Sequence, residues 1–358
     1  MNQKYDEDDL HTKKERKAAR KITSKKDRSQ YKKTDLEKRE RHLVEETQKR
    51  LAKKDLVRGR VLGISAEGIT VQHGEEICLC SLRGQLKQKW SQSKNLVTVG
   101  DFVLFEKEAT QNGSIAHIEE RRSVLSRQEH LRRRQQQLIA ANIDQVLISA
   151  SVVSPPLKPP LVDRYIIATY KGNMEPVIVV NKIDLLHARS EETIIFEQFV
   201  KTYRSLNIPV IPISASTGEG IEELKKHMQG KASVFSGQSG VGKSSLINAV
   251  TGLDLDVGDV VEKTRKGSHT TTSAHLIPLS FGGWCIDTPG IRSFGVWDLQ
   301  KEDLTAYFPE IDQIGHLCKY PNCTHSHEPG CALEEAVEEG RISPIRFDSY
   351  LKLLQEAS

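Results

Sequence analysis

Short runs rich in apolar and β-branched residues, separated by turns that contain glycine, occupy residues 55–127. These runs have the length and composition of β-strands. They read LVRGRVLGIS, GITVQHG, EEICLCSLRG, DFVLFEKE and GSIAHIEERRS. Five strands in so short a segment predict a small barrel, plausibly of the OB type, a class that often binds oligonucleotides. Cys78 and Cys80 fall on one face of a predicted strand, and we expect them to pack rather than to bind a metal.

From about residue 142 onward the pattern changes, because apolar strands now alternate with helical segments. The predicted strands are 144–151, 175–184, 208–216 and 231–237, and the predicted helices are 161–172, 190–206, 220–228 and 243–250. Alternation of this kind indicates a parallel sheet with helices on both faces. The proline-rich stretch SPPLKPP, which precedes the first helix, is expected to be a stiff connector.

Composition divides the chain unevenly. The 358 residues are enough for two or three domains, and the net charge is +4. Residues 1–54 hold 19 Lys and Arg against 11 Asp and Glu, which predicts a basic tail that is disordered or loosely helical. Binding of a phosphate backbone and simple solubilisation are both open for this tail. The chain has no apolar run long enough to span a membrane and no targeting signal at its start, so a cytoplasmic protein is expected.

The stretch GQSGVGKS at 237–244 fits the phosphate-loop pattern G-x-x-x-x-G-K-[ST] and lies between a predicted strand and a predicted helix. In such a loop the backbone N–H groups surround phosphate oxygens, and the helix N-terminus favours an anion. Lys243 is expected to reach the β- and γ-phosphates, and the Ser244 hydroxyl to coordinate Mg²⁺. The expected phosphate-binding residues are Gly237, Gln238, Ser239, Gly240, Val241, Gly242, Lys243, Ser244 and Ser245.

Two further strand ends favour guanine over adenine. A carboxylate at Asp184, in the stretch Asn181-Lys182-Ile183-Asp184, can accept hydrogen bonds from N1–H and N2–H₂ of guanine, whereas adenine offers no matching donor pair. Asn181 and Lys182 can brace the loop and the base. Ser214 and Ala215, in the stretch ISAS, are expected to contact the guanine carbonyl. Together these stretches predict a site for GTP or GDP.

The stretch WCIDTPG places Asp287 at a strand end, where it can hold Mg²⁺, and places the Gly290 amide where it can meet the γ-phosphate. Thr271 is the expected third magnesium ligand, although the sequence does not separate it from Thr270 or Thr272. These are the signature elements of a GTPase, but the base-reading stretches precede the phosphate loop. The order predicts a circularly permuted GTPase domain, which close-lying termini make tolerable.

The residue after DTPG is Ile291, where many GTPases have a glutamine that orients the attacking water. An apolar side chain cannot orient water, so this group is expected to come from elsewhere. Lys243 and His269 are the candidate catalytic residues, with potassium or a partner as alternatives to His269. Slow intrinsic turnover that a partner raises is therefore expected.

Three of the six cysteines cluster near the C-terminus in the pattern Cys318-x₄-Cys323-x-His325-x₅-Cys331. Three thiolates and one imidazole complete a tetrahedral shell for one structural Zn²⁺ ion. His327 is a rival to His325, and free thiols are the alternative to a metal site. Cys285 lies in an apolar strand and is expected in the core.

The permuted order, the stretches GQSGVGKSSLIN, DTPGIRSFGVWDL and YFPEI, and the cysteine cluster together resemble the RsgA family of small-subunit-dependent GTPases. The resemblance spans about 55–350. It implies a GTP hydrolase that binds the small ribosomal subunit and its rRNA and assists late maturation. Hydrolysis then times release, and the subunit stimulates turnover. The family's zinc motif favours His325 as the fourth ligand.

The expected fold is therefore a multidomain α/β protein. It has a tail at 1–54, an OB-like barrel at 55–127, a circularly permuted P-loop GTPase domain at 128–297 and an α-helical zinc-binding domain at 298–358. A monomer is expected, because the sequence contains no obvious dimerisation segment. The alternative from another functional class is an RNA-binding scaffold that a nucleotide stabilises without a hydrolytic switch.

Overall fold

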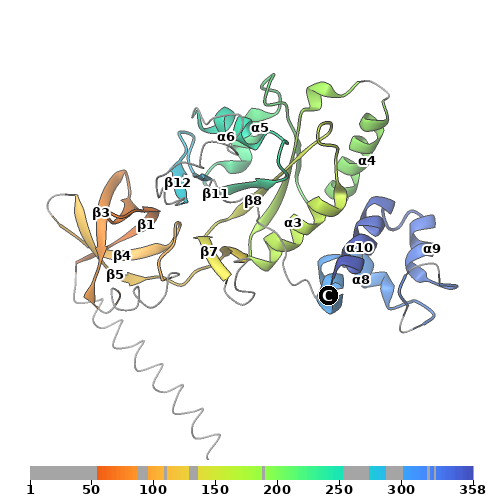
Figure 1. Cartoon of the computed structure of the whole chain (residues 1–358), viewed down its shortest axis with the longest axis horizontal. Coiled ribbons are helices and arrows are strands. Elements are labelled where there is room, and N and C mark those ends of the chain that lie inside the picture. Colours follow the sequence, from red (N-terminus) through yellow and green to blue (C-terminus); the bar gives the residue numbers. More distant parts are fainter. Residues whose placement is uncertain are drawn as a thin grey trace, which may run out of the picture. The chain divides into compact units, whose positions relative to one another are not determined.

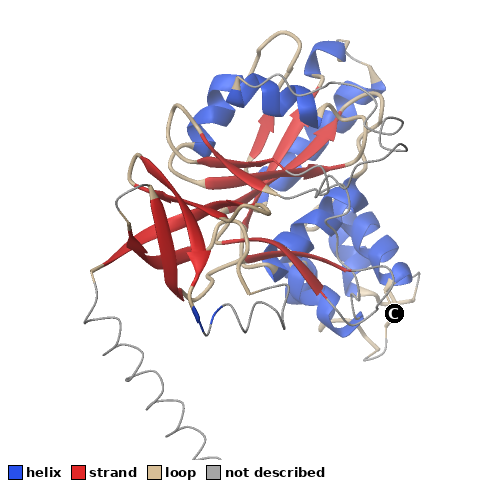
Figure 2. Cartoon of the chain, turned by 60° about the vertical axis from the view of Figure 1, so that its left-hand side comes forward, coloured by secondary structure: helices blue, strands red, loops and turns tan. Residues whose placement is uncertain are grey.

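The computed structural model describes most of the chain from Asp55 onward (Figure 1). The described residues are 55–84, 86, 96–108, 111–128, 136–187, 190–252, 274–287, 301–320, 323–325 and 328–357. From Val57 to Ser358 they belong to one compact unit. The tail predicted at 1–54 lies outside the described residues. Figure 2 shows that strands build the N-terminal part of this unit, whereas helices surround the second sheet and fill the C-terminal part.

A closed five-stranded barrel forms the N-terminal part of the described chain. Its strands are β1 (Leu56–Ile64), β2 (Ile69–His73), β3 (Glu76–Leu82), β4 (Phe102–Lys107) and β5 (Asn112–Ile118). The strand order is β1-β2-β3-β5-β4, and a β1–β4 pairing closes the barrel. The β3–β5 pair is parallel and the β1–β2, β2–β3 and β4–β5 pairs are antiparallel. The barrel predicted from five short strands is confirmed.

The barrel core is small and apolar. Val71, Cys78, Val103, Phe105 and Ile115 are fully buried in it, and Cys80 is 1% exposed. Burial raises the pKa of the Cys80 thiol to about 12, so this side chain stays neutral. Cys78 and Cys80 pack in the barrel core, as predicted.

A two-stranded hairpin that the sequence did not reveal follows the barrel. It consists of β6 (Val124–Gln128) and β7 (Gln136–Ala141), which pair antiparallel in a sheet of their own. The hairpin spans the predicted boundary between residues 127 and 128, so that boundary stays a prediction. An isolated bridge between Val99 and Ala140 ties β7 to the segment before β4.

The central sheet is mostly parallel and has the order β10-β9-β8-β11-β13-β12. Its strands are β8 (Gln145–Ser151), β9 (Glu175–Asn181), β10 (Val210–Pro212), β11 (Ala232–Gly237), β12 (His275–Pro278) and β13 (Trp284–Asp287). Only β12 runs antiparallel to its neighbour β13. Because β8, β9, β10, β11 and β13 run parallel, the carboxyl ends of strands from both halves of the domain meet at one edge of the sheet.

Helices cover both faces of this sheet because its strands bury side chains in both directions. Ile148 and Ile178 pack with α3 (Pro159–Lys171) and α4 (Glu191–Ser205) in one core cluster. Leu147 and Val177, each one residue earlier, pack with α5 (Ile221–Met228) and α6 (Lys243–Thr251) in another. This period-two alternation is what an apolar strand buried on both faces requires. The predicted parallel sheet is confirmed.

The C-terminal part is helical and packs on α3. It contains α7 (Lys301–Leu304), the 3₁₀ turn η5 (Thr305–Tyr307), α8 (Pro309–Gly315), α9 (Ala332–Glu338) and α10 (Pro344–Glu356). Their core includes Phe308, Leu333 and Tyr350 together with Ile167 of α3, beside which α10 lies (Figure 1). Among the described residues, no helix has the length and apolar character that crossing a bilayer needs.

A buried polar network joins α10 to α3 and α4. Arg346 is 3% exposed, and its Nη1 donates to Oδ1 of Asp163, which is fully buried. Tyr203 donates to the same carboxylate oxygen at 2.8 Å, and Arg346 Nε donates to Glu310 at 2.6 Å. The guanidinium also stacks on Phe308, with its central carbon 4.1 Å from the ring centroid. Removal of Arg346 would leave the buried Asp163 carboxylate without a cation, whereas Arg346 would keep Glu310 if Asp163 were removed.

Candidate functional site

The predicted phosphate loop runs from the end of β11 to the start of α6, at the carboxyl edge of the central sheet. Its glycines are required by space and by backbone angle. A Cβ on Gly237 would lie 2.1 Å from the carbonyl oxygen of Ser149. Gly242 has φ +91°, and a Cβ there would lie 2.5 Å from Nδ2 of Asn181. The loop therefore approaches β8 and the end of β9 more closely than any other residue type allows.

Lys243 lies across this loop. Its Nζ donates to the carbonyl oxygens of Gly237 at 2.8 Å and Gln238 at 2.7 Å. Lys243 is also the first residue of α6, where backbone N–H groups of the first turn have no partners within the helix. An ammonium group and a helix N-terminus thus meet at the same place, which suits the oxygens of a polyphosphate.

Asn181, at the end of β9, connects three loops and is 3% exposed. Its Nδ2 donates to the carbonyl oxygen of Val241 at 2.9 Å. Its Oδ1 accepts hydrogen bonds from the backbone N–H of Lys182 at 2.8 Å and of Ala215 at 3.0 Å. One amide therefore holds the phosphate loop, the base-reading stretch and the ISAS stretch at fixed positions. The structure thus brings together predicted site residues from both halves of the domain.

Lys182 adds a fourth segment to this assembly. It has a left-handed backbone with φ +66°, and its Nζ donates to the carbonyl oxygens of Gly240, at 2.8 Å, and of Ser154. The segment around Ser154 is the proline-rich stretch that the sequence indicated only as a connector. Nothing in its composition marks it as part of a site, because its contribution is a backbone carbonyl.

Asp184 is exposed at this edge, in the 3₁₀ turn η2 (Ile183–Leu185). The Ser214 hydroxyl lowers the pKa of Asp184 by hydrogen bonding to the carboxylate, and Ser216 and Lys182 act in the same direction. The Ile183 backbone N–H donates to the carbonyl oxygen of Ile213 at 3.3 Å, which ties η2 to the ISAS stretch. The carboxylate is therefore ionised and open to a ligand that offers two N–H donors, as guanine does.

The structure describes some of the remaining predicted site residues and does not describe the others. Val241 is 2% exposed and belongs to the core, whereas Ser244 and Ser245 are half-buried in the first turn of α6 and Ser239 is exposed. The backbone of Asp287 ends β13, the neighbour of β11. The other expected residues lie outside the described residues, namely His269, Thr270, Thr271, Thr272, Gly290 and Ile291.

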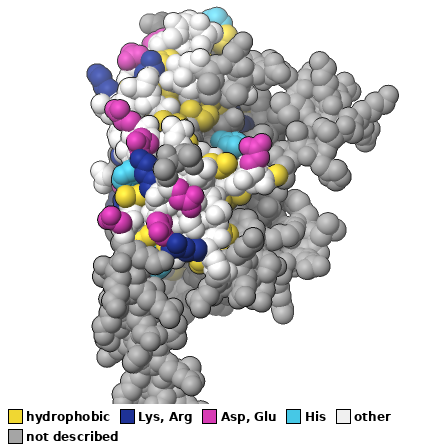
Figure 3. Space-filling view, turned by 90° about the vertical axis from the view of Figure 1, so that its left-hand side faces the viewer, with side chains coloured by type: hydrophobic (Ala, Val, Ile, Leu, Met, Phe, Trp, Pro, Cys, Tyr) yellow, Lys and Arg dark blue, Asp and Glu magenta, His cyan; other side chains and the backbone are white. Residues whose placement is uncertain are grey.

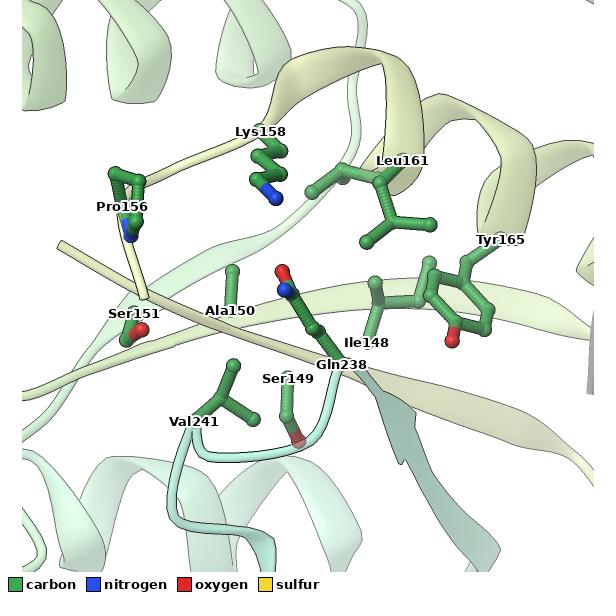
Figure 4. Close-up of a pocket in the computed structure, with 11 residues that line it drawn as sticks. Ile148, Ser149, Ala150, Ser151, Pro156, Lys158, Leu161, Tyr165, Gln238 and Val241 are labelled. Carbon is green, nitrogen blue, oxygen red and sulfur yellow. The ribbon is translucent and has the colours of Figure 1, made fainter. Parts of the chain in front are cut away.

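A small pocket lies between the phosphate loop, the end of β8 and the start of α3. Its lining includes Ser151, Lys158, Leu161, Tyr165, Gln238 and Val241. Figure 4 shows the side chains of Lys158 and Gln238 pointing toward one another across it. The backbone carbonyl oxygen of Gln238 accepts a hydrogen bond from Lys243, whereas its side chain points toward Lys158, which precedes α3. The sequence motif predicted the position of Gln238 but could not show which of its groups faces the loop.

A second cluster lies in the C-terminal part. One ligand atom from each of Cys318, Cys323, His325 and Cys331 lies within 4.8 Å of all the others. His325 presents Nδ1, which is 3.6 Å from Sγ of Cys318 and 3.6 Å from Sγ of Cys331. Four soft or borderline donors at this spacing fit one tetrahedral zinc ion, with a rearrangement of about 1 Å. His327, the rival ligand, lies outside the described residues.

The surroundings of this cluster also suit a cation. Removal from water lowers the pKa of His325, which keeps its imidazole neutral and able to act as a ligand. Removal from water and the neighbouring thiols raise the pKa of Cys323 to about 12, so this thiol stays protonated until a positive charge stabilises its thiolate. Cys285 is fully buried in β13, apart from this cluster, as expected for a core residue.

The described surface of the barrel carries both signs of charge. Figure 3 shows acidic, basic and hydrophobic side chains interspersed on the face that it draws. Several of the basic side chains are paired, as Arg58 is with Glu119 at 2.9 Å and Arg83 with Glu106 at 2.5 Å. A uniformly basic area is therefore absent from the part of this face that the structure describes. Recognition of a nucleic acid there would need shape and stacking as well as charge.

Comparison with known proteins supplies the context for this geometry. The family model described as RsgA GTPase matches residues 118–297. Two similar proteins are both called small ribosomal subunit biogenesis GTPase RsgA. The one from Flavobacterium psychrophilum is 37% identical over 280 residues, which cover 77% of this chain and 85% of that protein. The one from Chlorobaculum parvum is 43% identical over 273 residues, which cover 74% of this chain and 86% of that protein.

Two solved structures share the fold. The crystal structure of YjeQ from Thermotoga maritima has a TM-score of 0.68 and 34% sequence identity, and the match covers 84% of this chain and 98% of that one. YloQ, described as a circularly permuted GTPase, has a TM-score of 0.65 and 28% identity, with 84% of this chain and 94% of that one covered. The central domain is therefore a circularly permuted P-loop GTPase domain, as the order of its motifs predicted. The chain belongs to the RsgA GTPase family.

Proposed function

We propose that this protein is a GTP hydrolase that binds the small ribosomal subunit and its rRNA, assists late maturation of the subunit and leaves when GTP is hydrolysed. The observation that carries the proposal is the Asn181 amide, which joins a guanine-reading stretch to a phosphate loop. The names of the relatives, small ribosomal subunit biogenesis GTPase, support the choice of partner.

In this proposal Asp184 reads the guanine base, with Ser214 and Ala215 beside the base carbonyl. The backbone N–H groups of the phosphate loop and Lys243 hold the phosphates. Ser244, Asp287 and Thr271 would hold Mg²⁺, which would supply positive charge beside the phosphates. Support comes from the exposed, ionised Asp184 carboxylate and from the position of Lys243 at the start of α6. The Gly290 amide would meet the γ-phosphate.

The water that attacks the γ-phosphate needs a polar group to orient it, and Ile291 cannot supply one. We assign this role to His269, and we expect slow turnover in the free protein and faster turnover on the subunit. The His269→Ala variant tests the assignment. Subunit-stimulated turnover that stays unchanged in this variant would exclude His269 and leave potassium or a partner group as the source.

The four side chains Cys318, Cys323, His325 and Cys331 would hold one zinc ion that fixes the loop between α8 and α9. Closed four-ligand sites of this kind are structural, since they leave no position for a substrate. The ion would therefore stabilise the C-terminal helices and take no part in hydrolysis.

Phosphate release from GTP, measured with and without purified small subunits, tests the proposal. We expect turnover that small subunits stimulate and large subunits do not. A Lys243→Ala variant serves as the control, because it keeps the barrel and the zinc cluster but loses the phosphate ligand. Tight GTP binding without turnover in any of these mixtures would favour the alternative, a scaffold that the nucleotide only stabilises.

A further inference from the structure

The β12–β13 hairpin is the part of the central sheet that pairs with the barrel. Gly63 of β1 pairs antiparallel with His275 of β12, so the barrel and the central sheet are hydrogen-bonded into one continuous sheet. In the sequence this hairpin connects the segment that contains Thr271 to the segment that contains Gly290. It therefore separates the two stretches expected to respond to the γ-phosphate.

Side chains reinforce this contact. The guanidinium carbon of Arg60, in β1, lies 4.4 Å from the ring centroid of Trp284, in β13. Trp284 Nε1 donates to Oε1 of Gln72, in β2, at 3.0 Å. One indole thus contacts two neighbouring barrel strands, through its face and through its N–H group.

Arg60 is 6% exposed, and its guanidinium carbon also lies 5.1 Å from the ring centroid of Phe102, in β4. Its Nη2 donates to the carbonyl oxygen of Asn142 at 2.6 Å, but its Nε has no hydrogen-bond acceptor among the described residues. Burial lowers the pKa of Arg60 to about 10. The charge of Asp144 raises this pKa, and the charges of Arg122 and Arg58 lower it. A buried cation without full hydrogen bonding gains substantially from aromatic faces, so Trp284, the nearer of the two rings, and Phe102 both contribute to its position.

β1 and β12 approach each other closely where Gly63 pairs with His275. A Cβ on Gly63 would lie 2.7 Å from Nδ1 of His275, so the imidazole rests directly on the backbone of β1. Between Val61 and Gly63 the register of β1 shifts, and Leu62 joins the core of the central domain while Val61 stays in the barrel core. A displacement of the hairpin therefore acts directly on β1 and on the contact between Arg60 and Trp284.

We propose that Arg60 and Trp284 are positioning residues that couple the barrel to the nucleotide site. Trp284 begins the strand that Asp287 ends, and a short paired strand moves as a rigid segment. A macromolecule bound to the barrel therefore changes the affinity for GTP relative to GDP through Arg60 and Trp284. By linkage, the bound nucleotide changes the affinity of the barrel for that macromolecule by the same factor. This inference rests on the proposed function, which supplies the small subunit as the macromolecule.

The first test measures dissociation constants for GDP and for a non-hydrolysable GTP analogue, with and without saturating small subunits. In the unaltered protein we expect the ratio of the two constants to change by about 5-fold or more when subunits are added. Arg60→Met keeps an apolar stem but lacks the charge. In this variant we expect the ratio of the two dissociation constants to stay the same when subunits are added. Arg58→Met is the matched control, because Arg58 stacks on Phe102 within the barrel, at 4.0 Å, and does not contact the hairpin in any interaction that the structure shows.

The second test needs no substitution in the contact itself and so does not depend on the folding of the Arg60→Met variant. Trp284 is made the sole tryptophan by Trp90→Phe and Trp297→Phe. We expect its fluorescence emission to differ between the GDP-bound and analogue-bound protein, because the nearby guanidinium changes its distance from the indole. Identical emission in the two states would overturn the proposal.

The two proposals fail in different ways. Absence of subunit-stimulated turnover in the unaltered protein refutes the proposed function. If subunits stimulate turnover but change the ratio of dissociation constants equally in the unaltered protein and in Arg60→Met, only the role of Arg60 and Trp284 is refuted.

Discussion

The side-chain amide of Asn181 donates a 2.9 Å hydrogen bond to the carbonyl oxygen of Val241, 60 positions later in the chain. In an unpermuted GTPase the base-reading asparagine follows the phosphate loop, whereas here it precedes it. The contact shows that the reordered chain brings the predicted base-reading stretch and the predicted phosphate loop together. Site geometry in this fold therefore depends on which strand ends meet at the sheet edge and not on their order.

Replacement of Asn181 by Ala is expected to destabilise the nucleotide-free protein by about 2–4 kcal/mol. The variant leaves two backbone N–H groups and one carbonyl group without partners, in a position that is 3% exposed. Asp184→Ala is the control, because Asp184 is exposed and its loss should weaken guanine nucleotide binding without a change in unfolding free energy. Urea unfolding of the three proteins without ligand measures the difference, and equal stabilities would contradict the role given to Asn181.

Replacement of Asp184 by Asn should change the base that the site prefers. The amide offers a donor where the carboxylate accepted, so it matches the carbonyl group that xanthine has in place of the guanine amino group. We expect GDP affinity to fall by about 100-fold or more and xanthosine diphosphate to become the tighter ligand. Competition between the two nucleotides measures the change. Unaltered preference in the variant would mean that Asp184 does not read the base.

The sequence predicted where the motifs with characteristic side chains lie in the fold. The phosphate loop and the guanine-reading stretch are local motifs, and glycine spacing and strand ends placed them correctly at one edge of the sheet. It did not predict the contribution of Ser154, because a carbonyl group carries no residue identity. It also missed the β6–β7 hairpin and the pairing of Arg346 with Asp163, whose partners are 183 positions apart. Such contacts are set by packing between distant elements, for which a single sequence has no local signal.

Two glycines of the phosphate loop should differ in their tolerance of Ala. Gly242 and Gly240 have similar backbone angles, φ +91° and +84°, so Ala is strained at both. Only at Gly242 does the added Cβ clash, 2.5 Å from Nδ2 of Asn181, whereas at Gly240 its nearest contact is 3.5 Å, to Pro155. We expect Gly242→Ala to unfold at a lower denaturant concentration than Gly240→Ala. Denaturation of the ligand-free proteins decides this, and the reverse order would place the strain elsewhere.

Removal of metal should unfold the C-terminal helices selectively. We expect one equivalent of zinc in the purified protein, and loss of a thermal transition on chelation, because zinc binding by such clusters contributes about 10–16 kcal/mol coupled to folding. Cys331→Ser should lose the metal. Cys285→Ala should keep it, since Cys285 is buried in β13. Elemental analysis and calorimetry of both variants measure the two effects, and a metal-free protein with an unchanged melting curve would rule out a structural ion.

The ion pair between Arg346 and Asp163 should be critical for docking of the C-terminal helices on α3. Arg346→Met is expected to destabilise the protein by about 3–5 kcal/mol, because it leaves a fully buried carboxylate without its cation. Adding Asp163→Leu to that variant should recover part of the loss, since an apolar pair of similar volume needs no compensation. Arg341→Met is the control. Arg341 is 48% exposed in its pair with Glu339, and loss of such a pair costs about 0–1 kcal/mol. A double variant less stable than Arg346→Met, in guanidinium unfolding, would show that the hydrogen bond from Tyr203 to Asp163 stabilises this junction more than the unpaired carboxylate destabilises it.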